Sequence, residues 1–112
     1  MTVAVIFSST RTPGVDEEYE GMAVEMDALA AAQPGYRGHE SARGADGFGI
    51  TVSYWVDDQA ARDWKQVAQH LQAQRLGRER WYSSYRVVVA DVIREYDFST
   101  SSPEPPAPRP AR

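Results

Sequence analysis

The 112-residue sequence predicts an α+β fold, in which a four-stranded antiparallel sheet carries two helices on one face. Two kinds of apolar pattern predict it. Four stretches show the alternation or the continuous apolar runs of strands, and two others repeat apolar residues every three or four positions, as helices do. Their order along the chain is β-α-β-β-α-β. With right-handed crossovers, this order gives the ferredoxin-like arrangement.

The first strand and the first helix are predicted in the N-terminal third of the chain. Residues 3–8 are apolar on both faces, which is typical of a central strand. Thr12-Pro13-Gly14 is a turn that precedes a helix, and Gln33-Pro34-Gly35 ends it. The apolar stripe of this helix has spacings of three and four and consists of Val15, Tyr19, Met22, Met26 and Leu29.

The other three strands are predicted after this helix. Residues 36–43 and 48–56 form a hairpin, because Asp46-Gly47 between them is a hairpin-turn signal. The final strand runs over Tyr85–Phe98. It is much longer than the roughly five or six residues of an ordinary strand.

The second helix is predicted between the hairpin and the final strand. Asp57 and Asp58 offer its N-cap, and it is expected to end near Leu76-Gly77. Its apolar stripe consists of Ala60, Ala61, Trp64, Val67, Ala68 and Leu71.

One face of the sheet is predicted to need a partner. The outer face of strand 48–56 is uniformly apolar, and both faces of the final strand are largely apolar. A single helical layer covers only one sheet face, so the other remains as a large apolar patch. We therefore expect a homodimer in which two sheets pack face to face and the long final strand reaches over the second copy. The alternative is a monomer with an ordinary solvated sheet face.

Composition excludes several classes of function. The net charge of −4 argues against binding to the phosphate backbone of nucleic acid. The chain has no cysteine, so disulfides and thiolate chemistry are excluded. The apolar run at residues 3–7 is too short to span a bilayer and lacks a basic region before it. We expect a cytoplasmic protein with no membrane association.

The C-terminal segment differs in composition from the rest. Residues 99–112 contain five of the seven prolines and almost no apolar side chains. Such a segment cannot bury enough surface to offset its ordering entropy. We expect a disordered tail with polyproline II character, preceded by one folded domain over residues 1–98.

Three phrases carry a family resemblance: PGYRGHESAR (34–43), ITVSYWVDDQAARDWKQVAQH (50–70) and GRERWYSSYRVVVADVIREY (77–96). Together they resemble the antibiotic biosynthesis monooxygenase family of dimeric α/β-barrel proteins, over nearly all of residues 3–98. The resemblance implies the fold and the dimer. It leaves the activity open, because the superfamily includes cofactor-independent oxygenases of polycyclic phenols, quinol oxygenases, haem-degrading oxygenases and members without a known substrate.

The predicted substrate-binding residues are Trp64, Phe7 and Val67. Trp64 lies at the centre of the second helix's apolar stripe and matches the helix tryptophan that lines the family's pocket. The alternative for Trp64 is simple filling of the core, which is the commonest role of a large aromatic side chain. Trp64 and Phe7 are suited to stack on an aromatic substrate.

The predicted catalytic residues are His70, Tyr85 and Arg86, which are candidates for handling protons and charge. His70 lies about 120° around the helix from Trp64, so it either points into a cleft as a proton shuttle or iron ligand, or is solvated. Tyr85 and Arg86 alternate along their strand, so at most one of them is expected to line the same cavity. His39, on the second strand, has less to recommend it.

Haem degradation is disfavoured by the comparison with the family. The haem-degrading members use an asparagine on the first strand with a tryptophan and a histidine on the second helix. This chain contains no asparagine, and its spacing from Trp64 to His70 is shorter than theirs. Gln74, at the more typical spacing, is not a strong axial ligand of iron. We expect no cofactor, while haem bound through His70 as an unconventional ligand stays open.

Two functions of different classes therefore remain. One is a cofactor-independent monooxygenase that binds a small phenol or quinol in an apolar pocket, removes its proton and lets the anion react with O2. The other is a non-catalytic dimeric barrel that binds a hydrophobic ligand. They differ in whether a base or donor such as His70 or Tyr85 points into the pocket.

Overall fold

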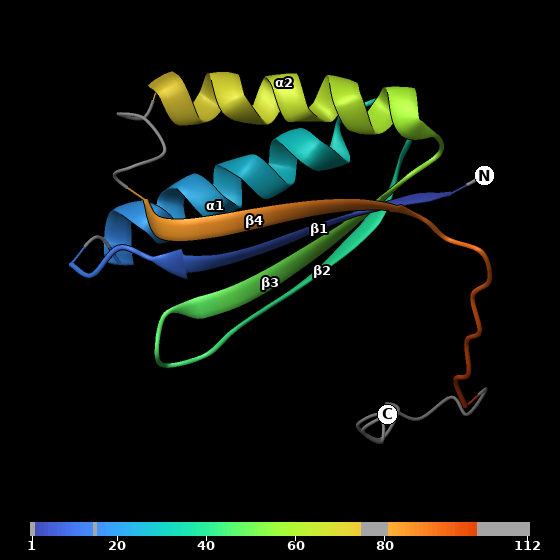
Figure 1. Ribbon diagram of the computed structural model, residues 1–112. Helices are drawn as coiled ribbons and strands as arrows, with labels where there is room; N and C mark the ends of the chain where they lie inside the picture. Colours follow the sequence, from blue (N-terminus) through green and yellow to red (C-terminus); the bar gives the residue numbers. More distant parts are fainter. Residues whose placement is uncertain (1, 15, 75–80, 101–112) are drawn as a thin grey trace.

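The computed structural model describes residues 2–14, 16–74 and 81–100, and it confirms the predicted ferredoxin-like fold (Figure 1). The elements are β1 (Val3–Arg11), α1 (Asp16–Ala31), β2 (Tyr36–Arg43), β3 (Phe48–Trp55), α2 (Asp58–Gln74) and β4 (Tyr82–Asp91). The predicted end of the second helix at Leu76-Gly77 and the proline-rich tail from residue 101 onward lie outside the described residues.

The sheet has the strand order β2-β3-β1-β4, and all neighbouring strands are antiparallel. β1 is therefore central, as its two apolar faces predicted. Both helices lie on one face of the sheet, which leaves the other face without a covering layer (Figure 1). We call these the covered face and the open face.

The final strand differs from the prediction at both of its ends. It starts at Tyr82, three residues early, because Tyr82 still pairs with Arg11 of β1. It ends at Asp91, and not at Phe98, because its pairing with β1 ends where Asp91 faces Val3. The last hydrogen bond of this ladder runs from the amide of Val92 to the carbonyl of Thr2 at 2.9 Å.

Local polar contacts fix the turns that surround the hairpin and α2. The carboxylate of Asp57 accepts a hydrogen bond from the amide of Ala60 at 2.8 Å, so Asp57 is the predicted N-cap of α2. In the β2–β3 turn, Gly47 has a φ of 86°, a conformation that favours glycine. The carboxylate of Asp46 accepts the amide of Phe48 at 3.1 Å and closes that turn.

The apolar core lies between the helices and the covered face, and it forms two clusters. Their members are Val3, Ala30, Trp55 and Ala61 in one, and Tyr19, Met22 and Trp81 in the other. Trp55 is fully buried, and its indole donates a hydrogen bond to the hydroxyl of Ser53 at 2.9 Å. The predicted apolar stripes of both helices supply much of this core.

The open face keeps large apolar side chains in contact with solvent. Phe48 and Ile50 are 45% and 42% exposed, as predicted for a face without a helical layer. Val56 follows the end of β3, and its side chain lies beside Gly35 near Ala60 of α2. Beyond β4 the chain leaves the sheet as an extended segment on the side opposite the helices (Figure 1). In this segment Ile93 and Tyr96 are 82% and 79% exposed.

Within the described ranges, no helix is both long enough and apolar enough to cross a membrane.

Candidate active site

A pocket of about 700 Å³ lies between the covered face and the two helices. This volume is within the range of roughly 300–1,000 Å³ that is typical of small-molecule sites. Its walls come from β1, α1, β2, β3, α2 and β4, and it borders residues of both core clusters. The cavity is a gap in the helix–sheet packing at the middle of the molecule.

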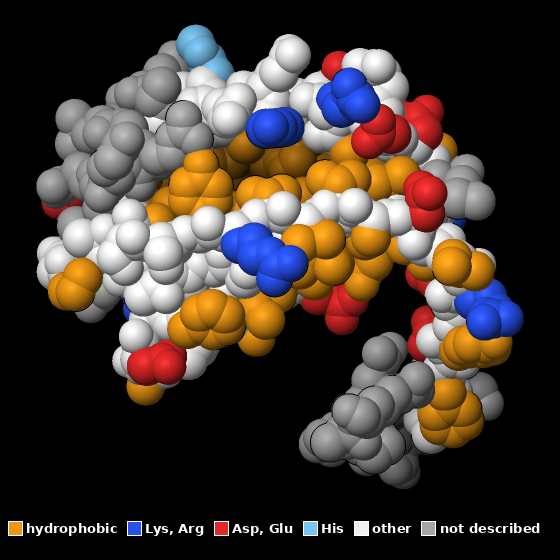
Figure 2. Space-filling view, in the orientation of Figure 1, with side chains coloured by type: hydrophobic (Ala, Val, Ile, Leu, Met, Phe, Trp, Pro, Cys, Tyr) orange, Lys and Arg blue, Asp and Glu red, His pale blue; other side chains and the backbone are white. Residues whose placement is uncertain are grey.

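The pocket opens at the edge strand β4. Tyr85, Val87 and Val89 lie on the covered face in register with β1, yet they are 42%, 43% and 53% exposed. They are exposed because β4 is the outermost strand and the helices do not close over it. Figure 2 shows the resulting hollow, lined by apolar side chains, between α2 and the edge of the sheet.

Aromatic rings form much of the pocket wall. Phe7 stacks on Tyr85 with ring centroids 5.6 Å apart and an interplanar angle of 25°. Trp64 stacks on the buried Trp55 with centroids 5.8 Å apart and an angle of 22°. A wall of this kind suits a flat aromatic ligand, because such a ligand can stack or make edge contacts with the rings.

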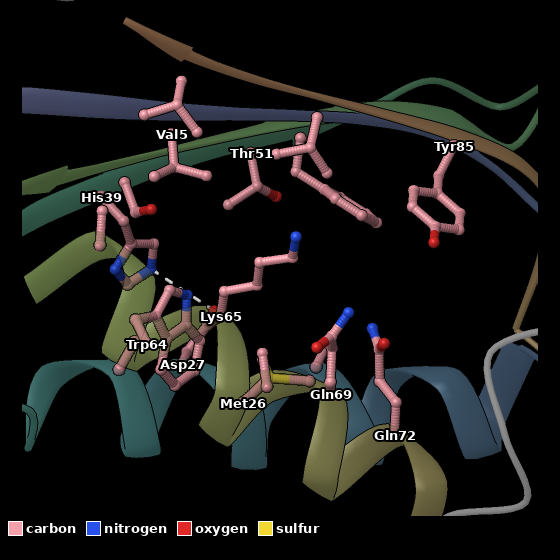
Figure 3. A pocket seen from close by; sticks show the side chains of 18 of the residues that line it. Val5, Met26, Asp27, His39, Thr51, Trp64, Lys65, Gln69, Gln72 and Tyr85 are labelled. Carbon is pink, nitrogen blue, oxygen red and sulfur yellow. Dashed lines mark ion pairs between the residues drawn. The ribbon is translucent and has the colours of Figure 1, made fainter. Parts of the chain in front are cut away.

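At one end of the pocket lies His39, held by two polar neighbours. Its Nδ1 is 2.6 Å from the hydroxyl of Tyr36. Its Nε2 is 3.7 Å from the carboxylate of Asp27, an ion pair when the imidazole is protonated (Figure 3). The side chains of His39 and Asp27 are 27% and 52% exposed, so the pair borders solvent as well as the cavity.

A β-bulge brings Tyr36 and His39 to the same face of the sheet. Residues three apart on a regular strand point to opposite faces. Here the register shifts between Tyr36 and Gly38, so that Tyr36 pairs with Trp55 and His39 with Ser53, two residues apart on β3. Gly38 has a φ of 136°, which favours glycine. The extra residue turns both rings toward the helices.

At the other end of the pocket, Tyr82 lies in a group of tyrosine and arginine side chains. Its ring packs edge-on against Tyr19 with centroids 5.8 Å apart. The guanidinium of Arg43 donates to the hydroxyl of Tyr19 at 2.7 Å and to that of Ser9 at 3.2 Å. Burial, with Tyr19 as the second cause, raises the pKa of the Tyr82 phenol well above its ordinary value of 10.0. Tyr82 is therefore a neutral hydrogen-bonding group at physiological pH.

The structure brings four of the six predicted site residues to this pocket. Phe7, Trp64, Tyr85 and Arg86 line it. Tyr85 and Arg86 alternate as expected, since Tyr85 is on the covered face and Arg86, which pairs with Ser8, starts from the open face, yet both border the pocket. The mouth of the pocket follows the edge strand, so residues from both faces of that strand border it.

The two other predicted residues do not line the pocket. His70 is exposed on α2, and Val67 is half-buried on the same helix. The row of α2 that faces the cavity includes instead Trp64, Lys65 and Gln69.

Sequence reasoning missed the polar residues of the pocket. The strand pattern alone does not show that His39 faces the helices, because it does not reveal the bulge between Tyr36 and Gly38. Lys65, Gln69 and Gln72 have the spacing i, i+4, i+7 and lie beside the apolar stripe of α2, so this spacing was a usable signal. Figure 3 shows all three side chains directed from α2 into the cavity.

The described residues of the pocket show no ligand set arranged for haem or for a resident metal ion. A haem iron needs a strong axial ligand, and both nitrogens of His39 face other partners, Tyr36 and Asp27. His70 lies away from the cavity. Among the described residues, no group of three His, Cys, Asp or Glu side chains is arranged to hold a metal ion.

The sheet, its two helices and the aromatic pocket beneath them define an α+β protein with a cavity of the size that is typical of small-molecule sites. The chain belongs to the antibiotic biosynthesis monooxygenase family, whose model matches residues 2–76. A relative, the protein YqjZ of Bacillus subtilis (strain 168), is 46% identical over 99 residues, which are 88% of this chain and 86% of YqjZ.

Solved structures show the same fold at lower identity. Rv0793 from Mycobacterium tuberculosis superposes with a TM-score of 0.72 at 17% identity, over 87% of this chain and all of Rv0793. SnoaB from Streptomyces nogalater, a cofactor-independent oxygenase, superposes with a TM-score of 0.66 at 21% identity. That match covers 84% of this chain and 95% of SnoaB.

Proposed function

We propose that the protein is a cofactor-independent monooxygenase that acts on a small phenol or quinol bound in the pocket beneath the helices. The observation that carries this proposal is a histidine with a carboxylate partner at the end of an aromatic cavity of about 700 Å³. Membership of the monooxygenase family and the structural likeness to SnoaB support it.

The proposed reaction draws all its electrons from the substrate. Removal of the phenolic proton gives an electron-rich anion, which transfers one electron to O2. The two radicals combine at a ring carbon to form a peroxide. Loss of the C–H proton and cleavage of the O–O bond then give a quinone and water. For 1-naphthol the balance is one naphthol and one O2 to one 1,4-naphthoquinone and one water.

His39 is the proposed general base. In the tautomer whose Nδ1–H donates to the oxygen of Tyr36, Nε2 carries the lone pair that accepts the phenolic proton. The carboxylate of Asp27, 3.7 Å from Nε2, then stabilises the imidazolium by its charge. A general base of this kind typically contributes about 10²- to 10⁴-fold to a rate.

The aromatic side chains are proposed to bind the substrate ring, and polar side chains to stabilise the charge that develops on it. Trp64 and Phe7 are proposed to stack on the substrate ring. The hydroxyl of Tyr85 points into the cavity and is proposed to donate to the substrate anion or to reduced O2 (Figure 3). Arg86, at the mouth, is proposed to contribute positive charge. His70 and Val67 have no part in this proposal because they do not line the pocket.

The test measures oxygen uptake with 1-naphthol and with 1,5-dihydroxynaphthalene. We expect one O2 per quinone formed and one atom of ¹⁸O in the quinone when ¹⁸O2 is supplied. His39→Gln is expected to lower kcat by at least about 100-fold, and the matched variant His70→Gln to leave it unchanged. Retained melting temperatures control for folding.

Two outcomes would contradict this proposal. Equal loss of activity in both histidine variants would remove His39 from the chemistry. Binding of the naphthols without oxygen uptake would favour the second candidate, a non-catalytic barrel that binds a hydrophobic ligand. The aromatic wall is expected under either function.

We also propose that the protein works as a homodimer. The exposed side chains of Phe48 and Ile50 on the open face support this, because a solvated apolar patch is costly. The extended segment after β4, with exposed Ile93 and Tyr96, has the length to contact a second copy. Light scattering of the full chain tests the proposal, and a concentration-independent monomer overturns it.

A further inference from the structure

The mouth of the pocket carries positive charge although the chain as a whole is acidic. The net charge of the sequence is −4. The charged residues that line the pocket are, besides His39, Asp27, Asp58, Arg62, Lys65 and Arg86. Two acids and three cations give this lining a formal charge of +1 with a neutral histidine. The pocket therefore has a local sign opposite to that of the molecule.

Two of these cations are not neutralised by neighbours. Arg62 pairs with Asp58 at 2.7 Å, and Asp27 faces His39. Within the part of the chain that the structure describes, neither Lys65 nor Arg86 forms an ion pair. Arginine is charged at any physiological pH, and an exposed lysine also carries its charge.

These two cations come from opposite sides of the opening. Lys65 belongs to α2 and Arg86 to the edge strand β4. Figure 2 shows Lys and Arg side chains on α2, above the apolar hollow, and a further one below it, across the backbone of the edge strand. Figure 3 shows the ammonium group of Lys65 directed across the cavity toward the sheet, with the amide of Gln69, one turn later on α2, directed into the same space.

From this arrangement we propose a carboxylate-binding subsite at the pocket mouth, formed by Lys65, Gln69 and Arg86. The substrate class is then a hydroxylated aromatic carboxylic acid, with its rings against Trp64 and Phe7 and its acid group at the mouth. This inference rests on the proposed function and narrows it. Ammonium, amide and guanidinium groups are all donors, and a carboxylate accepts from each of them.

The location at the mouth has two physical consequences. A cation pair beside low-dielectric aromatic walls attracts an anion into the opening and raises its association rate. It also fixes the direction of entry, because the acid group stays at the solvent edge while the apolar rings go inward. The phenolic end of the ligand is thereby directed away from the opening and into the pocket.

The test compares a carboxylate ligand with its uncharged methyl ester. The full-length protein is titrated without oxygen with 6-hydroxy-2-naphthoate and with its methyl ester, and binding is followed by calorimetry. We expect the acid to bind about tenfold or more tightly than the ester at low salt. The preference is expected to shrink in 0.5 M NaCl because salt screens exposed charges.

Variants that remove a charge show which residues cause the preference for the acid over the ester. Lys65→Gln with Arg86→Gln is expected to abolish the preference for the acid over the ester. Arg37→Gln removes a charge from an exposed residue of β2 that does not line the pocket, and it is expected to keep the preference. Equal binding of acid and ester by the wild type, no binding of either, or a preference that survives in the double variant would overturn the subsite.

Lys65 is the only lysine in the chain, which gives a second and direct measurement. Reductive ¹³C-methylation keeps its charge and labels it together with the α-amino group, whose much lower pKa distinguishes its signal. We expect 6-hydroxy-2-naphthoate, and not the ester, to shift the Lys65 signal. An unchanged signal in the presence of bound acid would exclude Lys65 from the subsite.

The subsite and the proposed function can fail separately. Oxygen uptake with 1-naphthol, which has no acid group, tests the oxygenase chemistry alone. The anaerobic titrations test the subsite alone.

Discussion

The two faces of the sheet differ in a way that reverses the usual expectation for a small protein. The covered face, under the helices, carries many of the polar side chains, including His39, Arg43 and Ser53. The open face carries exposed Phe48 and Ile50. Because polar groups are costly to bury unless they are paired, those on the covered face make hydrogen bonds or border the cavity.

This difference indicates a division of roles between the faces. The covered face contains the candidate site, and its polar groups are held by short contacts such as the 2.6 Å pair of Tyr36 and His39. The open face carries the Tyr54–Glu40 hydrogen bond at 3.1 Å, but its exposed Phe48 and Ile50 suit association with another apolar surface. The proposed chemistry and the proposed dimer contact thus lie on opposite sides of the same four strands.

The largest expected effect comes from removing one large aromatic from each face of β3. Trp55→Ala, on the covered face, is expected to lower the free energy of unfolding by about 3–5 kcal/mol, because it empties a fully buried site. Phe48→Ala is its matched variant on the open face. Its effect is expected to depend on protein concentration, because Phe48 would be buried only in a dimer. Denaturant unfolding at two protein concentrations measures the stability of both variants. A loss of stability for Phe48→Ala that does not depend on concentration would contradict the proposed division of roles between the two faces.

A charge on the open face is expected to have the next largest effect. Ile50→Glu would place two unpaired carboxylates in a symmetric apolar interface, and we expect association to weaken by at least about 100-fold. Sedimentation at several concentrations measures it. Gln66→Glu adds the same charge on an exposed position of α2 and serves as the control. Similar sedimentation of the two variants would argue against the open face as the interface.

A substitution at the bulge in β2 tests whether the bulge places the rings of Tyr36 and His39 on the covered face. Gly38→Ala puts a side chain at a φ of 136° and is expected to destabilise the protein by about 1–3 kcal/mol. It is also expected to loosen the Tyr36–His39 pair and so to lower kcat. Gly21→Ala, in open space on α1, is the control and should slightly increase the melting temperature. A neutral effect at Gly38 would mean that the bulge is not required.

The smallest effect concerns the buried phenol of Tyr82. Its folded-state pKa lies above the ordinary 10.0, so the folded protein keeps a proton that the unfolded chain loses. Stability is therefore unaffected below about pH 10 and falls as the pH rises above it, by at most about 1.4 kcal/mol per pH unit. Tyr82→Phe should remove this part of the alkaline decline. Urea unfolding of the wild type and the variant between pH 8 and 11 measures how the free energy of unfolding depends on pH. The same dependence in both proteins would contradict the raised pKa of Tyr82.

The fold was predictable because it depends on periodicity. The alternation at residues 3–8 and the stripe around Trp64 are properties of the chain alone, and both were confirmed. The end of β4 was not predictable from its own residues. Val92 and Ile93 continue an apolar run, but a strand needs a neighbour, and β1 begins only at Val3.

The site was predictable where it depends on side-chain type and not where it depends on backbone irregularity. Trp64 and Phe7 were identified from their size and their place on apolar faces, and both line the pocket. His39 was missed because the bulge at Arg37 and Gly38 changes the face to which it points. His70 was favoured by its distance from Trp64 along the helix, which did not determine its direction.

The stacked indoles of Trp55 and Trp64 give the molecule an internal optical reporter. Their rings are close and nearly parallel, so their excited states should couple and produce a paired signal in the near-ultraviolet circular dichroism spectrum. Trp64 also lines the cavity, whereas Trp55 and Trp81 do not. Occupancy of the pocket should therefore change the emission and the dichroism of the unlabelled protein, which would allow screening of colourless ligands before any activity is known.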